Sequence, residues 1–265
     1  MTSPATPPRA GRLGLYGPLI ALAIAVATWS LGWLWLKGAA ERGLDAAASR
    51  LAHAGGAFTW QGRRVHGYPF RLDVDFTNLT WREPTGWAVT VPRLKSEAFV
   101  FAPEHWVAMA PDGVVLIRPA GGAVKIAAKL LRASLSAPAA DPPTVSLEGL
   151  GLTFTPLPGA APYFLQGARE LHVHTRAGPS DQGAFYFELD GARPAPTSAI
   201  GRMTLGAPVT LIANAIYSHA SAARGPGWAS AVRAWARAGG QVESGRLRLA
   251  AGPFAFDARG AGLSA

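Results

Sequence analysis

Residues 71–81 read Arg-Leu-Asp-Val-Asp-Phe-Thr-Asn-Leu-Thr-Trp, and this stretch sets the character of the chain. Leu72, Val74 and Phe76 alternate with polar residues, which is the period-two pattern of a strand with one apolar and one polar face. The apolar phase then shifts by one position, so that Leu79 and Trp81 take over. The segment therefore predicts a half-buried β-strand, and the shift within it indicates a bulge.

Comparable segments fill most of the remaining chain, and turns rich in Gly and Pro separate them. We expect further strands at 88–91, 94–101, 106–109, 114–117, 124–135, 145–154, 163–175, 185–189, 209–217, 242–249 and 254–258. One helix, near residues 228–238, is expected before Gly239-Gly240. Strands that follow one another without intervening helices favour an antiparallel meander. The predicted fold class is thus mainly β: an extended curved sheet, an open barrel or a sandwich, with a possible subdivision near 137–143.

The N-terminal part has a different pattern. Residues 15–36 carry no charge, and at about 1.5 Å per residue they form a helix of roughly 33 Å, enough to cross a hydrocarbon core of about 30 Å. Residues 37–56 continue at helical spacing and predict a stalk. The alternatives for residues 15–36 are a cleaved signal peptide, whose apolar core is shorter, and a buried helix of a soluble protein. The length and the terminal tryptophans favour a transmembrane anchor.

The distribution of charge around this segment predicts its orientation. Arg9 and Arg12 precede it without any acidic residue, whereas the charges that follow it nearly cancel. The positive-inside rule then gives a cytoplasmic tail at 1–14 and a β-rich periplasmic domain at 57–265. We expect a single-pass protein of a bacterial inner membrane.

The composition excludes several classes of protein. There is no cysteine, so a disulfide scaffold, a thiolate metal site and a cysteine nucleophile are ruled out. The net charge is +9, but the basic residues are scattered singly, which argues against a nucleic-acid partner. Apolar residues make up 49% of the chain and charged residues only 15%, a balance that favours a packed domain with exposed apolar surface.

Several short motifs resemble a known bacterial family. They are the tryptophans at the end of the apolar segment, Gly67-Tyr68-Pro69-Phe70-Arg71, the pair Trp81 and Trp87, and the segment from Phe99 to Pro103. Together they are similar to the uncharacterised envelope family known as domain of unknown function 2125. The resemblance implies a single-span envelope protein with no established activity. The C-terminal helix and glycine-rich strands are also similar to repeats of AsmA-type proteins, which handle lipid traffic between membranes.

The search for catalytic or metal-binding residues gives little. His172 and His174 would share one face of a strand with Glu170, which is a conceivable metal-ligand set, but it is also the natural polar face of that strand. Asp73 and Asp75 form a similar pair, for which an exposed polar face is again the simpler interpretation. Arg64 and His66 precede the Gly67–Arg71 motif, where a role in binding is conceivable; the other interpretation is that the motif only sets the entry into the strand.

No phosphate-binding loop, nucleophile elbow or zinc-protease motif occurs in the sequence. We therefore expect a protein that is not an enzyme and that needs neither a metal nor a cofactor.

Two hypotheses for function remain. In the first, the curved sheet binds lipid or another hydrophobic envelope component in a groove, whose expected lining is Leu72, Val74, Phe76, Ile126 and Leu130. In the second, the domain is a tethered scaffold that recruits envelope proteins, for which an unpaired C-terminal strand would be suited.

Overall fold

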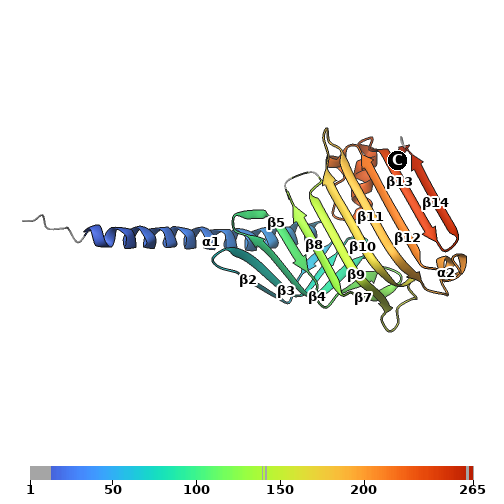
Figure 1. Ribbon diagram of the computed structural model, residues 1–265, viewed down its shortest axis with the longest axis horizontal. Helices are drawn as coiled ribbons and strands as arrows, with labels where there is room; N and C mark the ends of the chain where they lie inside the picture. The colour runs from blue at the N-terminus through green and yellow to red at the C-terminus, as the bar shows by residue number, and fades with distance from the viewer. Residues whose placement is uncertain (1–12, 139, 141, 261–262, 265) are drawn as a thin grey trace, which may run out of the picture.

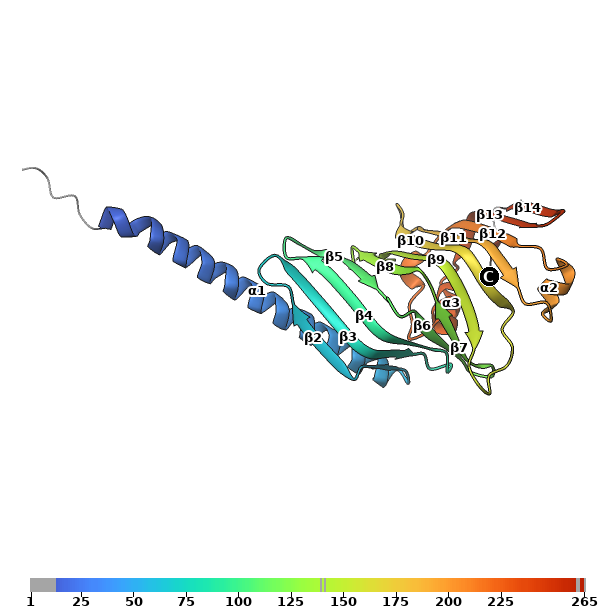
Figure 2. The same cartoon turned by 60° about the horizontal axis from the view of Figure 1, so that its bottom comes forward.

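The computed structural model describes residues 13–138, 140, 142–260 and 263–264. A single helix, α1 (Leu13–His53), contains both the predicted membrane segment and most of the predicted stalk. It projects far beyond the sheet, as Figures 1 and 2 show. Residues Tyr16–His53 are long and apolar enough to include a membrane span. The predicted tail at 1–14 lies outside the described residues, apart from residues 13–14, which belong to α1.

In the described part of the chain, fifteen strands follow the helix and form one sheet. Their bounds are β1 Ala57–Thr59, β2 Gly62–His66, β3 Arg71–Arg82, β4 Ala88–Phe99, β5 Ala102–Met109, β6 Val114–Arg118, β7 Gly122–Ala127, β8 Leu130–Ser136, β9 Thr144–Pro156, β10 Leu165–Ala177, β11 Gly183–Pro194, β12 Val209–Tyr217, β13 Gln241–Ala251, β14 Phe254–Gly260 and β15 Leu263–Ser264. The fold class predicted from the sequence is confirmed, in the form of a curved open sheet rather than a closed barrel.

The sheet is an antiparallel meander with one branch. The main path runs β1-β3-β4-β5-β8-β9-β10-β11-β12-β13-β14, and β6 and β7 bridge from β4 to β9 beside it. Pro92 lies in β4 between the part that pairs with β6 and the part that pairs with β5, where its missing N–H costs no ladder bond. β8 and β9, on either side of the predicted subdivision at 137–143, pair directly with each other.

The strands keep a register that sorts side chains by face. A row of directly paired residues crosses the sheet from Val65 on β2 through Val74, Ser96, Ala108, Ala133, Leu147, Val173, Phe187, Ala213 and Leu247 to Ala258 on β14. Paired residues share a face, and this row lies on the side of the sheet that contacts α1, which we call the inner face. Nearly all of its members are apolar.

The opposite side, the outer face, is polar. The neighbouring row runs from Asp73 through Glu97, Val107, Ser134, Ser146, His174, Tyr186, Asn214 and Arg246 to Arg259. Cross-strand ion pairs stabilise this face, among them Arg132 with Glu148 at 2.5 Å and Arg246 with Asp257 at 2.5 Å. The period-two pattern seen first at residues 71–77 thus continues across the sheet.

Strand β3 changes its apolar phase without changing its register. Thr77 pairs with Arg93 and Leu79 with Val91, so no residue is inserted relative to β4. Between them, Asn78 adopts a left-handed backbone with φ of 47°. Its side chain donates a hydrogen bond to Gln61 Oε1 at 2.6 Å. The expected phase shift is therefore real, but a left-handed residue produces it in place of a bulge.

Two apolar clusters hold the fold together. The first joins α1 to the N-terminal strands: Trp33 packs with Val65, Leu72, Val74, Phe76, Leu79, Val91 and Ala110. Leu36, Ala40 and Leu44, one helical stripe of α1, cover this cluster. The second cluster lies between strands at the other end of the sheet and contains Leu152, Leu165, Ala168, Ala192, Val209 and Ala251.

Among the described residues, two short α-helices and a 3-10 helix, η1 (Ala220–Ala222), complete the structure. The sequence did not predict α2 (Ala199–Met203), whereas α3 (Trp228–Arg237) matches the predicted helix at 228–238. Glu83, at the end of β3, accepts a hydrogen bond from the Trp228 N–H at 3.2 Å and so connects α3 to the N-terminal half of the sheet. The predicted strand at 124–135 is divided into β7 and β8.

Candidate functional site

The five residues predicted to line a groove do not line a common surface. Leu72, Val74 and Phe76 are only 1%, 2% and 5% exposed and lie beneath α1 in the first cluster. Ile126 packs against the second cluster. Leu130 is half-buried and pairs with Leu150, in the register of the outer face. The first three are thus part of a packed core, because the stalk half of α1 covers the sheet where they lie.

The accessible part of the inner face lies farther along the sheet. A second row of paired residues, Leu171, Leu189, Leu211, Leu249 and Phe256, crosses β10 to β14 beside the Val173–Leu247 row. Exposure along these strands increases towards the edge, to 42% at Leu247, 39% at Leu249 and 55% at Phe256. A continuous apolar surface therefore starts at the helix and ends at β14.

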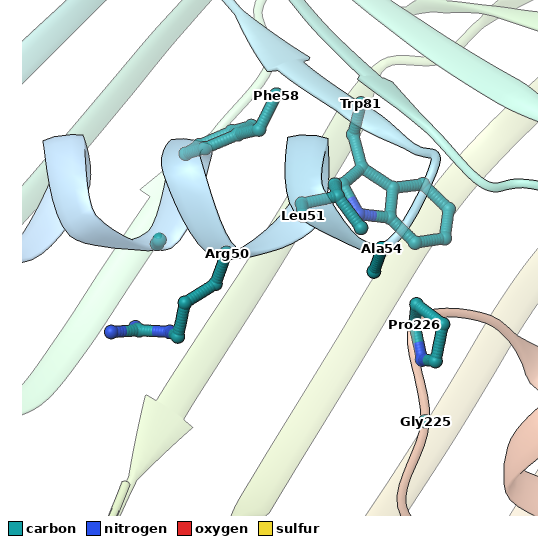
Figure 3. Close-up of a pocket in the computed structure, with 8 residues that line it drawn as sticks. Arg50, Leu51, Ala54, Phe58, Trp81, Gly225 and Pro226 are labelled. Carbon is teal, nitrogen blue, oxygen red and sulfur yellow. The ribbon is translucent and has the colours of Figure 1, made fainter.

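Two adjoining cavities lie where α1 ends. The first, of about 520 Å³, is lined by Ala47, Arg50, Leu51, Ala54, Phe58, Trp81, Gly225 and Pro226. Figure 3 shows the Trp81 indole beside Leu51 and Ala54, with Pro226 opposite, while the Arg50 side chain extends away from the indole. The second, of about 420 Å³, includes Trp81, Trp87, Leu116 and Trp228. Trp81 lines both, so the two cavities adjoin at its indole, and together we call them the groove.

The loop and helix that close this groove come from the C-terminal third of the chain. Trp235 of α3 donates a hydrogen bond to the Ser218 carbonyl at 2.7 Å, and its ring contacts Tyr217 edge-on at 6.4 Å. Burial raises the pKa of the Tyr217 hydroxyl. No α3 residue is fully buried, and Trp228 is 76% exposed. The wall on this side is consequently less tightly packed than the wall formed by α1.

The motif Gly67-Tyr68-Pro69-Phe70-Arg71 forms the turn between β2 and β3 and contacts α1. Trp29 Nε1 donates to the Pro69 carbonyl at 2.9 Å, and Trp33 Nε1 donates to the Arg71 carbonyl at 2.8 Å. Gly67 has φ of 103°, and a Cβ there would lie 2.8 Å from the Arg71 carbonyl oxygen, so the turn requires glycine. The motif therefore positions the sheet on the helix.

A polar cluster occupies the outer face behind this turn. His66 Nε2 lies 3.0 Å from Asp75 Oδ2, and Arg71 lies 3.0 Å from Asp73 Oδ2. Lys95 and Glu97 also line the shallow cavity of about 180 Å³ that these groups share. The predicted pair Asp73 and Asp75 thus takes part in ion pairs; Asp73 is buried, and its Oδ1 has no partner among the described residues. Arg64 pairs in register with Asp75 on the same strand pair.

The predicted histidine pair lies in the middle of the outer face. The rings of His172 and His174 are stacked with centroids 6.1 Å apart. His172 contacts Glu170 at 3.3 Å, and His174 contacts Ser146 at 2.9 Å. Across residues 13–260, gaps excepted, no three His, Asp or Glu side chains are grouped so as to hold a metal ion.

Sequence reasoning missed the residues that line the actual groove. Trp81 and Trp87 were recognised as a motif but were not among the residues predicted to line a groove, and Trp228 was placed on the predicted helix without a role. The available signal was the residue type. Tryptophans have an apolar ring with a polar edge and are common at binding surfaces, and these three lie next to turns and at a helix start. Only the fold brings the end of β3 beside a helix start 145 positions later.

Comparisons with known proteins give one match. No curated protein and no solved structure is significantly similar to the chain. A family model, DUF2125, matches residues 33–262, which include the stalk and nearly all of the sheet. The matched region begins at Trp33, the residue through which α1 enters the first apolar cluster. The chain belongs to this bacterial family, whose description is "uncharacterized protein conserved in bacteria".

Proposed function

We propose that this protein is anchored in the bacterial inner membrane by α1 and binds the acyl chains of an envelope lipid on the inner face of its periplasmic sheet. The orientation rests on Arg9 and Arg12 ahead of the apolar segment. The absence of recognisable catalytic motifs in the sequence favours a binding protein over an enzyme.

One observation carries the proposal: the apolar inner face is continuous from the helix to the sheet edge, yet only its first half is covered. At the sheet edge, Leu247 is 42% exposed and Phe254 is 62% exposed. Exposed apolar surface on this scale normally marks a site for a hydrophobic partner. A helix that can span a bilayer packs on the covered end of this same face, so the bilayer is a nearby source of apolar ligands.

The groove is chemically suited to a hydrocarbon chain. Phe58, Trp81 and Trp87 provide flat apolar walls, and Arg50, Glu83 and Thr85 are the polar members of the lining. Each methylene group moved from water into such a site gains about 0.8 kcal/mol, so that eight methylenes supply roughly 6 kcal/mol before ordering costs. A chain that continues from the groove along the Leu171–Phe256 row would cover the exposed half of the inner face.

The test uses the full chain purified in a mild detergent, with retained lipids identified by native mass spectrometry and extraction. Leu247 lies on the inner face and Ile216 on the outer face of neighbouring strands, and both are 42% exposed. Substitutions at these two positions therefore make a matched pair. We expect Leu247→Glu to reduce the retained lipid several-fold and Ile216→Glu to leave it unchanged. Absence of lipid from the unmodified protein, or equal effects of both variants, would rule the proposal out.

A second candidate function, the envelope scaffold, is favoured by the edge of the sheet. Among the described residues β14 pairs only with β13, and Phe254 and Phe256 are exposed on it. An edge strand of this kind can add a strand from a partner protein. Copurification of a defined envelope protein with the lipid-free chain, abolished by a proline at Ala255, would favour the scaffold.

A further inference from the structure

A group of exposed aromatic side chains lies at the end of the sheet where the β2–β3 turn contacts α1. The turn between β2 and β3 presents Tyr68 and Phe70, and the turn between β4 and β5 presents Phe99 and Phe101. With Trp29 of α1 they form what we call the aromatic collar. These side chains are 41–72% exposed, and the Phe99 and Phe101 rings stack with centroids 5.0 Å apart. They are too exposed to serve as a core.

Hydrogen bonds fix the position of the collar relative to α1. Besides the hydrogen bonds from Trp29 and Trp33 to the first turn, Ser30 Oγ lies 2.9 Å from the Tyr68 hydroxyl. The two turns are joined by a hydrogen bond from the Val100 N–H to the Phe70 carbonyl at 3.0 Å. The level of the collar along α1 is therefore that of residues 29–33, and Figures 1 and 2 show the β2–β3 turn beside the helix.

That level lies inside the apolar segment. The first charge after the segment is Lys37, eight positions beyond Trp29, which corresponds to about 12 Å along a helix. If the bilayer ended before the collar, only residues 13–28 would remain to cross it, a length of about 24 Å against the roughly 30 Å required. The helix can span only if the collar enters the membrane boundary.

We propose that the aromatic collar is inserted into the outer interface of the bilayer, among the headgroups and first methylenes of the lipid. This inference rests on the membrane anchor of the proposed function and extends it to the sheet. Aromatic rings favour this layer because they have an apolar body and a polar edge. Polar side chains follow the aromatic ones on the same strands: Arg71 pairs with Glu97, and Glu104 contacts His105.

Insertion of the collar fixes how the sheet stands on the membrane. The tips of two turns and the helix make three contacts with the bilayer, so the sheet cannot swing freely about α1 as it could on a flexible tether. Its far end, with α2 and the β13–β14 turn, is then held away from the lipid surface (Figure 1). The collar is thus a positioning surface, and its partner is the lipid bilayer.

The absence of cysteine allows a direct test, because any cysteine introduced into the full chain is unique. Phe101→Cys reports on the collar, Met203→Cys on α2 at the far end, and Ile24→Cys on the helix; these residues are 72%, 75% and 62% exposed. Each variant is labelled with a nitroxide and reconstituted into phosphatidylethanolamine–phosphatidylglycerol vesicles. Collision rates with oxygen, which concentrates in lipid, and with a water-soluble nickel chelate are then compared by electron paramagnetic resonance.

We expect the oxygen-to-nickel ratio to be highest at position 24, several-fold above the aqueous value at position 101, and aqueous at position 203. A ratio at 101 equal to that at 203, with 24 still in lipid, would overturn the collar and leave the anchor standing. An aqueous ratio at 24 would instead overturn the anchor, and the collar with it. Phe99→Cys repeats the measurement on the neighbouring ring and guards against misfolding at position 101.

Discussion

The two halves of the inner face have the same kind of residues but different surroundings. On β3 the stalk half of α1 covers the strand and leaves Val74 only 2% exposed, whereas Leu247, in the same row on β13, is 42% exposed. An apolar row is therefore a core in one half and an accessible surface in the other. The comparison shows that a period-two pattern predicts which face a residue is on, while burial depends on what packs against that face.

The largest expected effect separates the two halves by their contribution to stability. Leu72 is 1% exposed under α1, so Leu72→Ala removes packed methyl groups and should lower the free energy of unfolding by about 3 kcal/mol. Leu249 is 39% exposed, and Leu249→Ala should cost less than about 1 kcal/mol. Urea titration of the full chain in detergent measures both. Equal losses would mean that the far half is also a core.

A second prediction addresses how α1 is held on the near half. Trp33 is 7% exposed and donates to the Arg71 carbonyl, so Trp33→Phe leaves that carbonyl without its partner and should cost about 1–2 kcal/mol. The matched change is Trp35→Phe, because Trp35 is 68% exposed on the same helix, two positions after Trp33. The same urea titration applies. A loss as large at Trp35 would show that indole size matters and that the hydrogen bond does not.

The comparison also marks how far the sequence could lead. The alternation at Leu72, Val74 and Phe76 predicted both the strand and its apolar face, and the uncharged segment from residue 15 predicted the long helix. The predicted groove used the same three residues, but the docking of α1 on them depends on bonds from Trp29 and Trp33 to backbone carbonyls of a distant turn. Every residue has a backbone carbonyl, so the residue types in a sequence do not predict which carbonyl a tryptophan will bind.

The division of residues 124–135 into β7 and β8 had a comparable cause. The segment contains neither Gly nor Pro to mark an interruption, and β7 and β8 follow each other along β9 in one register. Only the change of the other neighbour, from β6 for β7 to β5 for β8, shows where the strand is divided. The groove at Trp81 likewise requires Glu83 to receive the start of α3. The position of the groove therefore depends on long-range strand pairing and on helix docking. The alternation of apolar and polar residues along the chain does not predict either of them.

The last prediction concerns what stabilises the far half, where packing on the inner face is weak. Asp190, on the outer face of β11, accepts a hydrogen bond from Thr210 Oγ1 on β12 at 2.8 Å and pairs with Arg169 on β10. The Thr210 hydroxyl and the Arg169 guanidinium hold the pKa of Asp190 below its ordinary value. We expect Asp190→Asn to lower the free energy of unfolding by about 1 kcal/mol at pH 7.

The pH dependence gives this prediction its sign. Because the pKa of Asp190 is lower in the folded state, its stabilisation is complete above the unfolded pKa of about 3.9 and is lost as the pH falls through the folded value. The difference between the unmodified protein and Asp190→Asn should thus be constant from pH 5 to 7 and shrink below about pH 4. Thr210→Val, which removes the main cause of the shift, should make the pH-dependent stabilisation smaller and complete its loss at a higher pH. A difference independent of pH down to 3 would show that the far half is held by its inner-face packing after all.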